Sequence, residues 1–266
     1  MRQSLLVLMS FFCLQGCLDQ TQEKQLIFPE ISLGKSKDKI DWGDYYSYDY
    51  DIFVRKSQAR HTPNEKDEIR LNQTTSDPGY PSFLNGTTIK IKITDSSVTP
   101  GEKNELEEAI ATLNSVPCFG ISFQLVRAGS WDIDIEKQGI PTESGTYDNC
   151  NGATFHDNGQ PGNSLGTEIW FGPDVYSSAG PDHLEELFIH ELLHCIGVGH
   201  TDDDVNDYHF PGTPVEDNNS IMNGGCSCAD CPGTAQLSQY DECLLVNMYP
   251  ENSTCQYACP GTGIKL

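Results

Sequence analysis

Three of the chain's seven histidines lie within one short stretch, HELLHCIGVGH, which covers residues 190–200. His190 and His194 are four residues apart, a spacing that places two side chains on one face of a helix, one turn from each other. A turn at Gly197 can then bring His200 to the same point, because glycine accepts the left-handed conformation that ends many helices. Three imidazoles with one open position are typical of a catalytic zinc site rather than a structural one.

Glu191 follows the first histidine directly, where it is placed to act on a bound metal ion rather than to hold it. Zinc lowers the pKa of a coordinated water to about 7, so hydroxide forms at neutral pH. We therefore predict that Glu191 is the general base, which accepts a proton from the metal-bound water and passes it to the leaving amine. A helix that merely carries two histidines is the alternative, and the full pattern HExxHxxGxxH favours the metal site.

A helix that begins near Asp182 must carry the first two histidines. Asp182 and Glu185 have the spacing of a capping box. One apolar stripe of this helix lies on a different face from the histidines, so the stripe can pack on a sheet while both imidazoles face a cleft. The stripe consists of Leu184, Phe188, Leu192 and Cys195.

The sheet is predicted from five segments that read as strands from their pattern of apolar residues. Ordered structure is expected to begin near Phe83, just before the first of them. A long helix over 99–116 separates the first two segments; Thr99 can cap it and Pro100 suits its first position. This order of elements predicts an α+β fold with a mixed sheet and helices packed on it. The five segments are residues 87–94, 121–128, 131–137, 151–159 and 166–173.

The zinc motif, the segment SIMNG around Met222 and the closing segment 237–250 together resemble metzincin zinc endopeptidases. The closest resemblance is to the bacterial dual-action HEIGH metallopeptidase family, with matrix-metalloproteinase-like features in the last segment. It covers about residues 85–250. Leu192 and Leu193 replace the Ile-Gly pair that is usual inside the family's motif.

The resemblance implies a metzincin-type fold: a five-stranded sheet with two helices above a cleft, and a small irregular lower subdomain after Gly197 that ends in a C-terminal helix. It implies Zn²⁺ held by His190, His194 and His200, with Glu191 as base and Met222 in the methionine turn. In some metzincins an acid at the position of Asp202 orients the turn beneath the zinc. The alternative is that Asp202 is a solvated carboxylate in the acidic loop 201–207. A Ca²⁺ site in this loop is a further alternative, although the spacing of its acidic residues fits no defined calcium-binding loop.

Residues 1–17 are predicted to be a secretory signal that ends at a lipobox-like cysteine, Cys17, which would carry lipid. Their apolar run is too short to span a membrane, and an ordinary signal peptide is the alternative. Residues 18–82 read as a polar tether or short pro-segment, and 83–266 as the catalytic domain. Within the tether, Asp44 in DWGD resembles the aspartate switch of astacin pro-segments; a solvated acidic tether is the alternative.

The protein is therefore expected to be exported, either lipid-anchored to the bacterial cell envelope (outer membrane or cell surface) or secreted. Nine cysteines follow Cys17, which fits an oxidising compartment, and the odd number leaves at least one free or paired outside the chain. The cluster CSCADC (226–231) is expected to form disulfides rather than a metal knuckle, and Cys195 to be structural. His156 and His209 are expected at the surface.

The formal net charge is -23, with 39 acidic and 16 basic side chains, which argues against nucleic acid as a partner. We predict a monomeric zinc endopeptidase whose protein or peptide substrate binds extended along an edge strand and so adds to the sheet. Two alternatives stay open: a non-catalytic zinc-binding envelope protein, and a zinc amidohydrolase that acts on cell-wall peptides.

Overall fold

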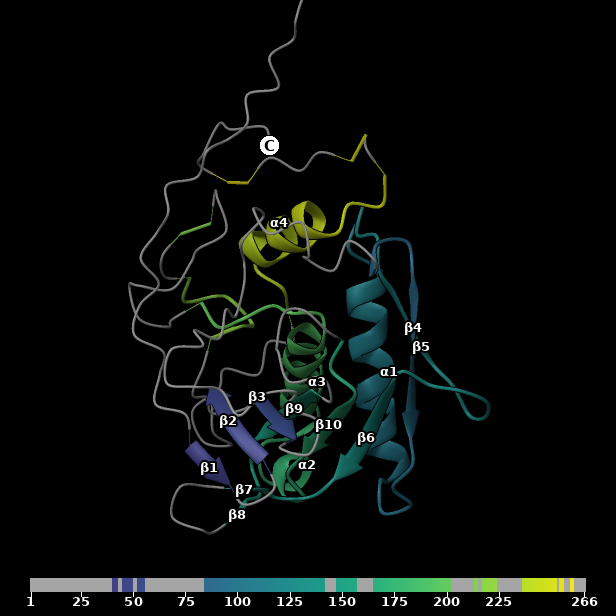
Figure 1. The fold of residues 1–266 in the computed structure, drawn as a ribbon, viewed down its shortest axis with the longest axis vertical. Helices are drawn as coiled ribbons and strands as arrows, with labels where there is room; N and C mark the ends of the chain where they lie inside the picture. Colours follow the sequence, from purple (N-terminus) through teal and green to yellow (C-terminus); the bar gives the residue numbers. More distant parts are fainter. Residues whose placement is uncertain are drawn as a thin grey trace, which may run out of the picture. The chain divides into compact units, whose positions relative to one another are not determined.

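The computed structural model describes residues 40–42, 45–49, 52–55, 84–141, 147–156, 165–201, 213–214, 217–223, 236–252, 254–255 and 259–260. Within these residues, eight strands form one sheet in the order β1-β2-β3-β9-β10-β6-β4-β5 (Figure 1). A separate hairpin pairs β7 (Ile140–Pro141) with β8 (Tyr147–Asp148). The strands of the sheet are β1 (Ile40–Trp42), β2 (Tyr45–Asp49), β3 (Ile52–Arg55), β4 (Thr88–Ile93), β5 (Ser122–Leu125), β6 (Ile133–Lys137), β9 (Gly152–His156) and β10 (Glu168–Phe171).

The five predicted strands are confirmed as β4, β5, β6, β9 and β10. Neighbouring strands from β5 to β10 run parallel, and β9 is antiparallel to β10. With helices packed on this mixed sheet, the α+β fold class is confirmed.

The expectation that ordered structure begins near Phe83 is wrong, because three short strands precede this residue. β1, β2 and β3 arise within residues 40–55, and β3 pairs in parallel with β9, so that Phe53 lies opposite Phe155. Ile52 and Phe53 are buried. β-branched and aromatic residues such as these fit a half-buried strand, and the side of β9 that does not pair with β10 offers its backbone groups to β3. The division of the chain into domains stays a prediction.

Two long helices, α1 (Pro100–Asn114) and α3 (Pro181–Cys195), pack against each other and on the sheet. Thr99 caps α1 as predicted. The capping box predicted for α3 is wrong, because the N-cap is Gly180, two residues before Asp182, and no side chain caps the helix. Two shorter helices are α2 (Val175–Ser178) and α4 (Gln239–Met248), the latter within the closing segment.

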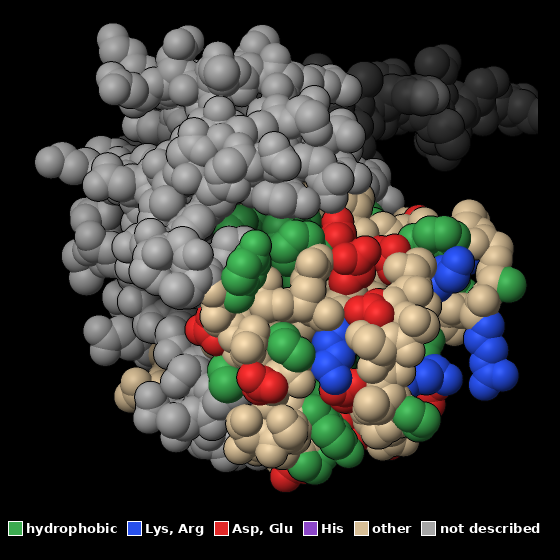
Figure 2. All heavy atoms as spheres, turned by 90° about the horizontal axis from the view of Figure 1, so that it is seen from below, with side chains coloured by type: hydrophobic (Ala, Val, Ile, Leu, Met, Phe, Trp, Pro, Cys, Tyr) green, Lys and Arg blue, Asp and Glu red, His purple; other side chains and the backbone are tan. Residues whose placement is uncertain are grey.

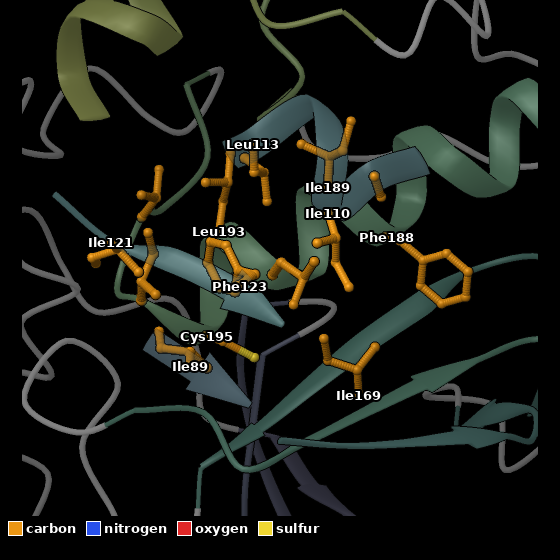
Figure 3. Close-up of a cluster of buried hydrophobic side chains, with 14 of the residues drawn as sticks. Ile89, Ile110, Leu113, Ile121, Phe123, Ile169, Phe188, Ile189, Leu193 and Cys195 are labelled. Atoms are coloured by element: carbon orange, nitrogen blue, oxygen red, sulfur yellow. The ribbon is translucent and has the colours of Figure 1, made fainter. Parts of the chain in front are cut away.

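The main core lies between the two long helices and the sheet. Figure 3 shows Ile189, Leu193 and Cys195 of α3 beside side chains of α1 and the sheet. The apolar stripe of α3 is therefore buried, as the sequence predicted. This packing fixes the rotation of α3 about its axis, and with it the direction of the histidines on the neighbouring face. The partners drawn include Ile110 and Leu113 of α1 and Ile89, Phe123 and Ile169 of the strands.

Glu102 ties the start of α1 to β6. Its carboxylate accepts hydrogen bonds from the Thr99 backbone N–H at 2.7 Å and from Lys137 Nζ at 2.6 Å. Burial by itself would raise the pKa of Glu102, but the hydrogen bonds from Lys137 and Thr99 outweigh it and hold the pKa below its usual value of 4.5.

We expect Glu102→Gln to lower the free energy of unfolding by about 2 kcal/mol at pH 7, since hydrogen bonds to charged groups contribute about 1.5–3 kcal/mol. Because the folded pKa is depressed, this stabilisation is present above the unfolded pKa of 4.5 and is lost as the pH falls through the folded pKa. Denaturant titrations at pH 7 and pH 3 measure it. The control is Glu107→Gln in an exposed pair with Lys103, which should cost less than about 0.5 kcal/mol. An equal loss of unfolding free energy at pH 7 and pH 3 would contradict the assignment of this stabilisation to the ionised carboxylate of Glu102.

Disulfides join the chain's C-terminal part to the rest. Cys118 pairs with Cys255, and Cys243 of α4 pairs with Cys259. Cys150 is also disulfide-bonded. Among the described cysteines, Cys195 is the free one, and its complete burial raises the pKa of the thiol far above its usual value. It is therefore a structural thiol, as predicted, and not a nucleophile.

Figure 2 shows one face of the molecule, on which described acidic side chains alternate with lysine and arginine. This part of the surface therefore carries no broad basic patch. Among the described helices, none combines the length and the apolar character that crossing a membrane requires.

Candidate metal centre

Three imidazoles converge where α3 ends. His190 and His194 project from the last two turns of the helix, and Gly197, with φ of 92°, turns the chain so that His200 returns to them. The Nε2 atom of His194 lies 2.9 Å from that of His190 and 3.1 Å from that of His200. The Nε2 atoms of His190 and His200 are 3.1 Å apart. The three nitrogen atoms thus form a nearly equilateral triangle that can hold a metal ion.

The other ring nitrogens decide which atoms can bind a metal. His190 Nδ1 lies 2.7 Å from the backbone carbonyl of Ile221, and His194 Nδ1 lies 2.7 Å from that of Val198. A carbonyl oxygen only accepts, so each Nδ1 carries the hydrogen and each Nε2 presents a lone pair to the others. Lone pairs that face one another repel unless a cation stands between them. Zinc–nitrogen bonds of about 2.0–2.1 Å in a tetrahedron separate such nitrogens by about 3.3 Å, so these residues fit the ion.

Glu191 lies against β9, the strand next to α3. Thr154 Oγ1 lies 2.8 Å from the carboxylate atom Oε2 of Glu191 and 2.9 Å from its backbone carbonyl, so the single hydroxyl hydrogen is shared between the two acceptors. The carboxylate fits over Gly152, where an added Cβ would come within 2.5 Å of Oε1. The side chain of Glu191 is only 2% exposed. β9 therefore fixes the position of the carboxylate of Glu191, the residue that follows His190 in α3.

The turn at Met222 lies beneath the histidines. In this turn, the backbone carbonyl of Ile221 accepts a hydrogen bond from Nδ1 of His190. The backbone carbonyl of Met222 accepts one from the N–H of Thr201, the residue after His200. Met222 itself is fully buried in the main core. The structure therefore places the predicted methionine turn directly against two histidine-bearing segments.

Asp241 of α4 holds this turn from behind. Its carboxylate accepts from the Ser220 hydroxyl, from the Ile221 N–H at 3.0 Å and from the Ser238 N–H at 2.9 Å. Burial raises the pKa of Asp241, although these hydrogen bonds act in the opposite direction. Further along the chain, the buried hydroxyl of Tyr249 donates to the carbonyl of Ile196, at the end of α3. α4 and the segment after it thus support both sides of the histidine cluster.

Comparisons with known proteins give only a distant fold likeness. No protein-family model and no curated protein matches the chain. The chain is similar to two solved structures of myroilysin. One has a TM-score of 0.43 and 16% identity, covering 63% of this chain and 82% of that one. The other has a TM-score of 0.42 and 17% identity, covering 62% and 84%. Both TM-scores are below 0.5, so the likeness by itself carries no functional argument.

The predicted site residues divide into two groups. The structure brings together the imidazoles of His190, His194 and His200, places the turn at Met222 against His190, and holds Glu191, the residue after His190, on β9. Asp202, Cys17, Asp44, His209 and the cysteines of 226–231 lie outside the described residues, so their predicted roles stay predictions.

The expected surface position of His156 is wrong. His156 is 1% exposed, because it ends β9 on the same face as Gly152 and Thr154, which is turned toward α3. Three residues near the site were not predicted from the sequence: Thr154, Gly152 and Asp241. For Asp241 the capping-box spacing after Ser238 was a usable signal, but it indicates only a helix start and not the contact with the turn.

Proposed function

We propose that the chain is a zinc-dependent endopeptidase. The observation that carries the proposal is the convergence of three imidazole Nε2 atoms, together with a buried carboxylate, Glu191, which follows His190 in α3 and is held by a different element, β9. A protein that only stores or senses zinc needs the histidines. It has no need of a glutamate fixed next to them.

His190, His194 and His200 would hold the zinc ion, which when bound supplies Lewis acidity and lowers the pKa of a coordinated water. Glu191 would accept a proton from the attacking water at its carboxylate and deliver it to the nitrogen of the leaving amine. The hydrogen bonds from the two Nδ1 atoms keep His190 and His194 in the tautomer that binds metal.

An extended peptide is the substrate that this geometry favours, because β9 lies against Glu191 and a strand next to β9 would carry its peptide bonds past the base. We also propose that the protein is exported and anchored by lipid at Cys17. The disulfides support an oxidising compartment for the folded domain.

The test is hydrolysis of casein and of purified cell-wall peptides by the full chain, with and without zinc. We expect one zinc ion per chain, cleavage of casein, loss of cleavage when a chelator removes the zinc, and recovery when zinc is returned. Cleavage of cell-wall peptides alone would move the assignment to an amidohydrolase. Zinc binding with no cleavage of either substrate would favour a binding protein.

A further inference from the structure

The end of α3 carries a buried backbone carbonyl that the helix itself cannot satisfy. Ile196 is the C-cap of α3 and is 1% exposed. The last carbonyls of a helix have no intrahelical partner, so a buried one must receive a hydrogen bond from elsewhere in the fold. Within the described part of the chain, the donor to the Ile196 carbonyl is the hydroxyl of Tyr249, 53 positions away. A side chain from beyond α4 therefore completes the end of the helix.

The turn that this hydrogen bond holds lies between two of the proposed zinc ligands. Ile196 comes two positions after His194 and four positions before His200. The carbonyl of Val198, in the same turn, accepts from Nδ1 of His194 and so orients its ring. Gly197, with φ of 92°, sets the direction in which the chain returns. A shift of Ile196 would therefore displace both the carbonyl that orients His194 and the backbone that carries His200.

Tyr249 is itself held in a fixed position. Its backbone N–H donates to the Leu245 carbonyl at 2.9 Å, and its carbonyl accepts from the Gly120 N–H at 2.6 Å. Its ring packs edge-on against that of Phe119 with the centroids 6.3 Å apart, and the whole residue is completely buried. Because both the backbone and the ring are fixed, the hydroxyl can hold the carbonyl of Ile196 in one place.

The chain on either side of this contact is tied down outside the metal centre. Phe119 forms a β-bridge with Pro250, and the N–H of Glu251 donates to the Cys118 carbonyl at 2.8 Å. A disulfide joins Cys118 to Cys255. The support for the turn thus comes from a part of the fold that contributes no proposed zinc ligand, so it can be changed without replacing a histidine or the base.

We infer that Tyr249 is a positioning residue for the proposed zinc centre: its hydroxyl fixes the turn after α3 and thereby the relative position of His194 and His200. The inference rests on the proposed function, because it concerns the ligands of the proposed ion. The role of Tyr249 differs from that of Asp241, whose carboxylate holds the turn that contacts His190. The histidine cluster therefore has a separate support on each side.

The test measures the zinc affinity of the full chain by competition with a chromogenic chelator, in the wild type and in Tyr249→Phe. Phenylalanine keeps the ring that packs against Phe119 but leaves the Ile196 carbonyl without its donor. We expect the Kd for zinc to rise about tenfold, at the low end of what loss of a hydrogen bond behind a metal ligand usually causes. We also expect a change in the absorption bands of bound Co²⁺, which report the coordination geometry.

Two further proteins separate positioning from a general loss of stability. Val175→Ala removes completely buried methyl groups in α2, which precedes the start of α3, at the other end of that helix from the turn. It should lower the free energy of unfolding but leave zinc affinity and the cobalt bands unchanged. In the second protein, 4-aminophenylalanine at position 249 replaces the hydroxyl with another donor and should restore most of the lost affinity. If Tyr249→Phe does not fold, Phe119→Leu, which removes the ring packed against the tyrosine, takes its place with the same expected changes.

Equal zinc affinity and unchanged cobalt bands in the wild type and the variant would overturn the inference, while cleavage of casein by the wild type would leave the proposed function intact. Weaker binding by the variant, with no cleavage by the wild type, would support the inference and count only against the peptidase. An equal loss of affinity in Val175→Ala would assign the effect to general stability and overturn the inference. A wild type that binds neither zinc nor cobalt would overturn both.

Discussion

Glu191→Gln is expected to lower kcat for peptide hydrolysis by about 10²–10⁴-fold, the usual contribution of a general base, while zinc affinity stays within a factor of about two. Glutamine has nearly the same shape, and its amide oxygen can still accept from Thr154, so the packing over Gly152 is kept. What is lost is the ability to take up a proton. Initial rates on a casein-derived peptide measure the effect, with metal content determined on the same samples.

The matched control is Glu185→Gln, two turns earlier on α3. Glu185 is half-buried and accepts from the Thr112 hydroxyl at 3.0 Å, which an amide oxygen can also do, so this variant should keep the full rate. Retention of more than a tenth of the activity by Glu191→Gln would show that another group accepts the proton.

Asp241→Ala is expected to weaken zinc binding by about 10–100-fold and to lower the free energy of unfolding by about 3 kcal/mol. The carboxylate receives two backbone N–H groups and one hydroxyl in a buried place, and alanine leaves all three without their acceptor. The turn that supplies the Ile221 carbonyl to His190 then loses its support. Competition with a chromogenic chelator measures the affinity, and denaturant unfolding of the metal-free protein measures the stability.

Asp241→Asn separates charge from hydrogen bonding, because the amide can still accept from the backbone and donate to Ser220. Burial raises the pKa of Asp241 in the folded protein above the unfolded value of 3.8. Relative to Asp241→Asn, the wild type is therefore stabilised below pH 3.8, and this extra stability is lost as the pH rises through the folded pKa. Asp182→Ala, at an exposed position in the first turn of α3, is the control and should leave zinc affinity unchanged. Unaltered zinc affinity in Asp241→Ala would mean that the turn needs no support from α4.

The sequence predicted those parts of the fold that follow a local period. β4 and β6 alternate, and the apolar stripe of α3 repeats every three or four residues, so burial and direction could be inferred for Leu184 and Phe188. The metal centre was predictable for the same reason, since a helical spacing, a glycine turn and a third histidine all lie within eleven residues.

Contacts between distant segments could not be predicted in this way. β3 is a strand because β9 offers it an edge and Phe155 offers Phe53 a ring, about a hundred residues away in the chain. Thr154 meets Glu191 only after the sheet and α3 have packed. Neither pairing leaves a period or a motif near the residues that make it, and the acidic, tyrosine-rich composition around β2 hides its strand character.

The disulfide between Cys118 and Cys255 has a consequence for the metal-free protein. The two cysteines are 137 positions apart, and His190, His194, His200, Glu191 and Met222 all lie between them. An unfolded molecule with this bond intact is a closed loop, whose ends can no longer separate; in the chain-entropy model a loop of this length disfavours unfolding by about 5 kcal/mol. The zinc ligands are then confined to a smaller volume than an open chain would explore. Their effective concentration for one another stays high even without tertiary structure, which favours recapture of the ion during refolding.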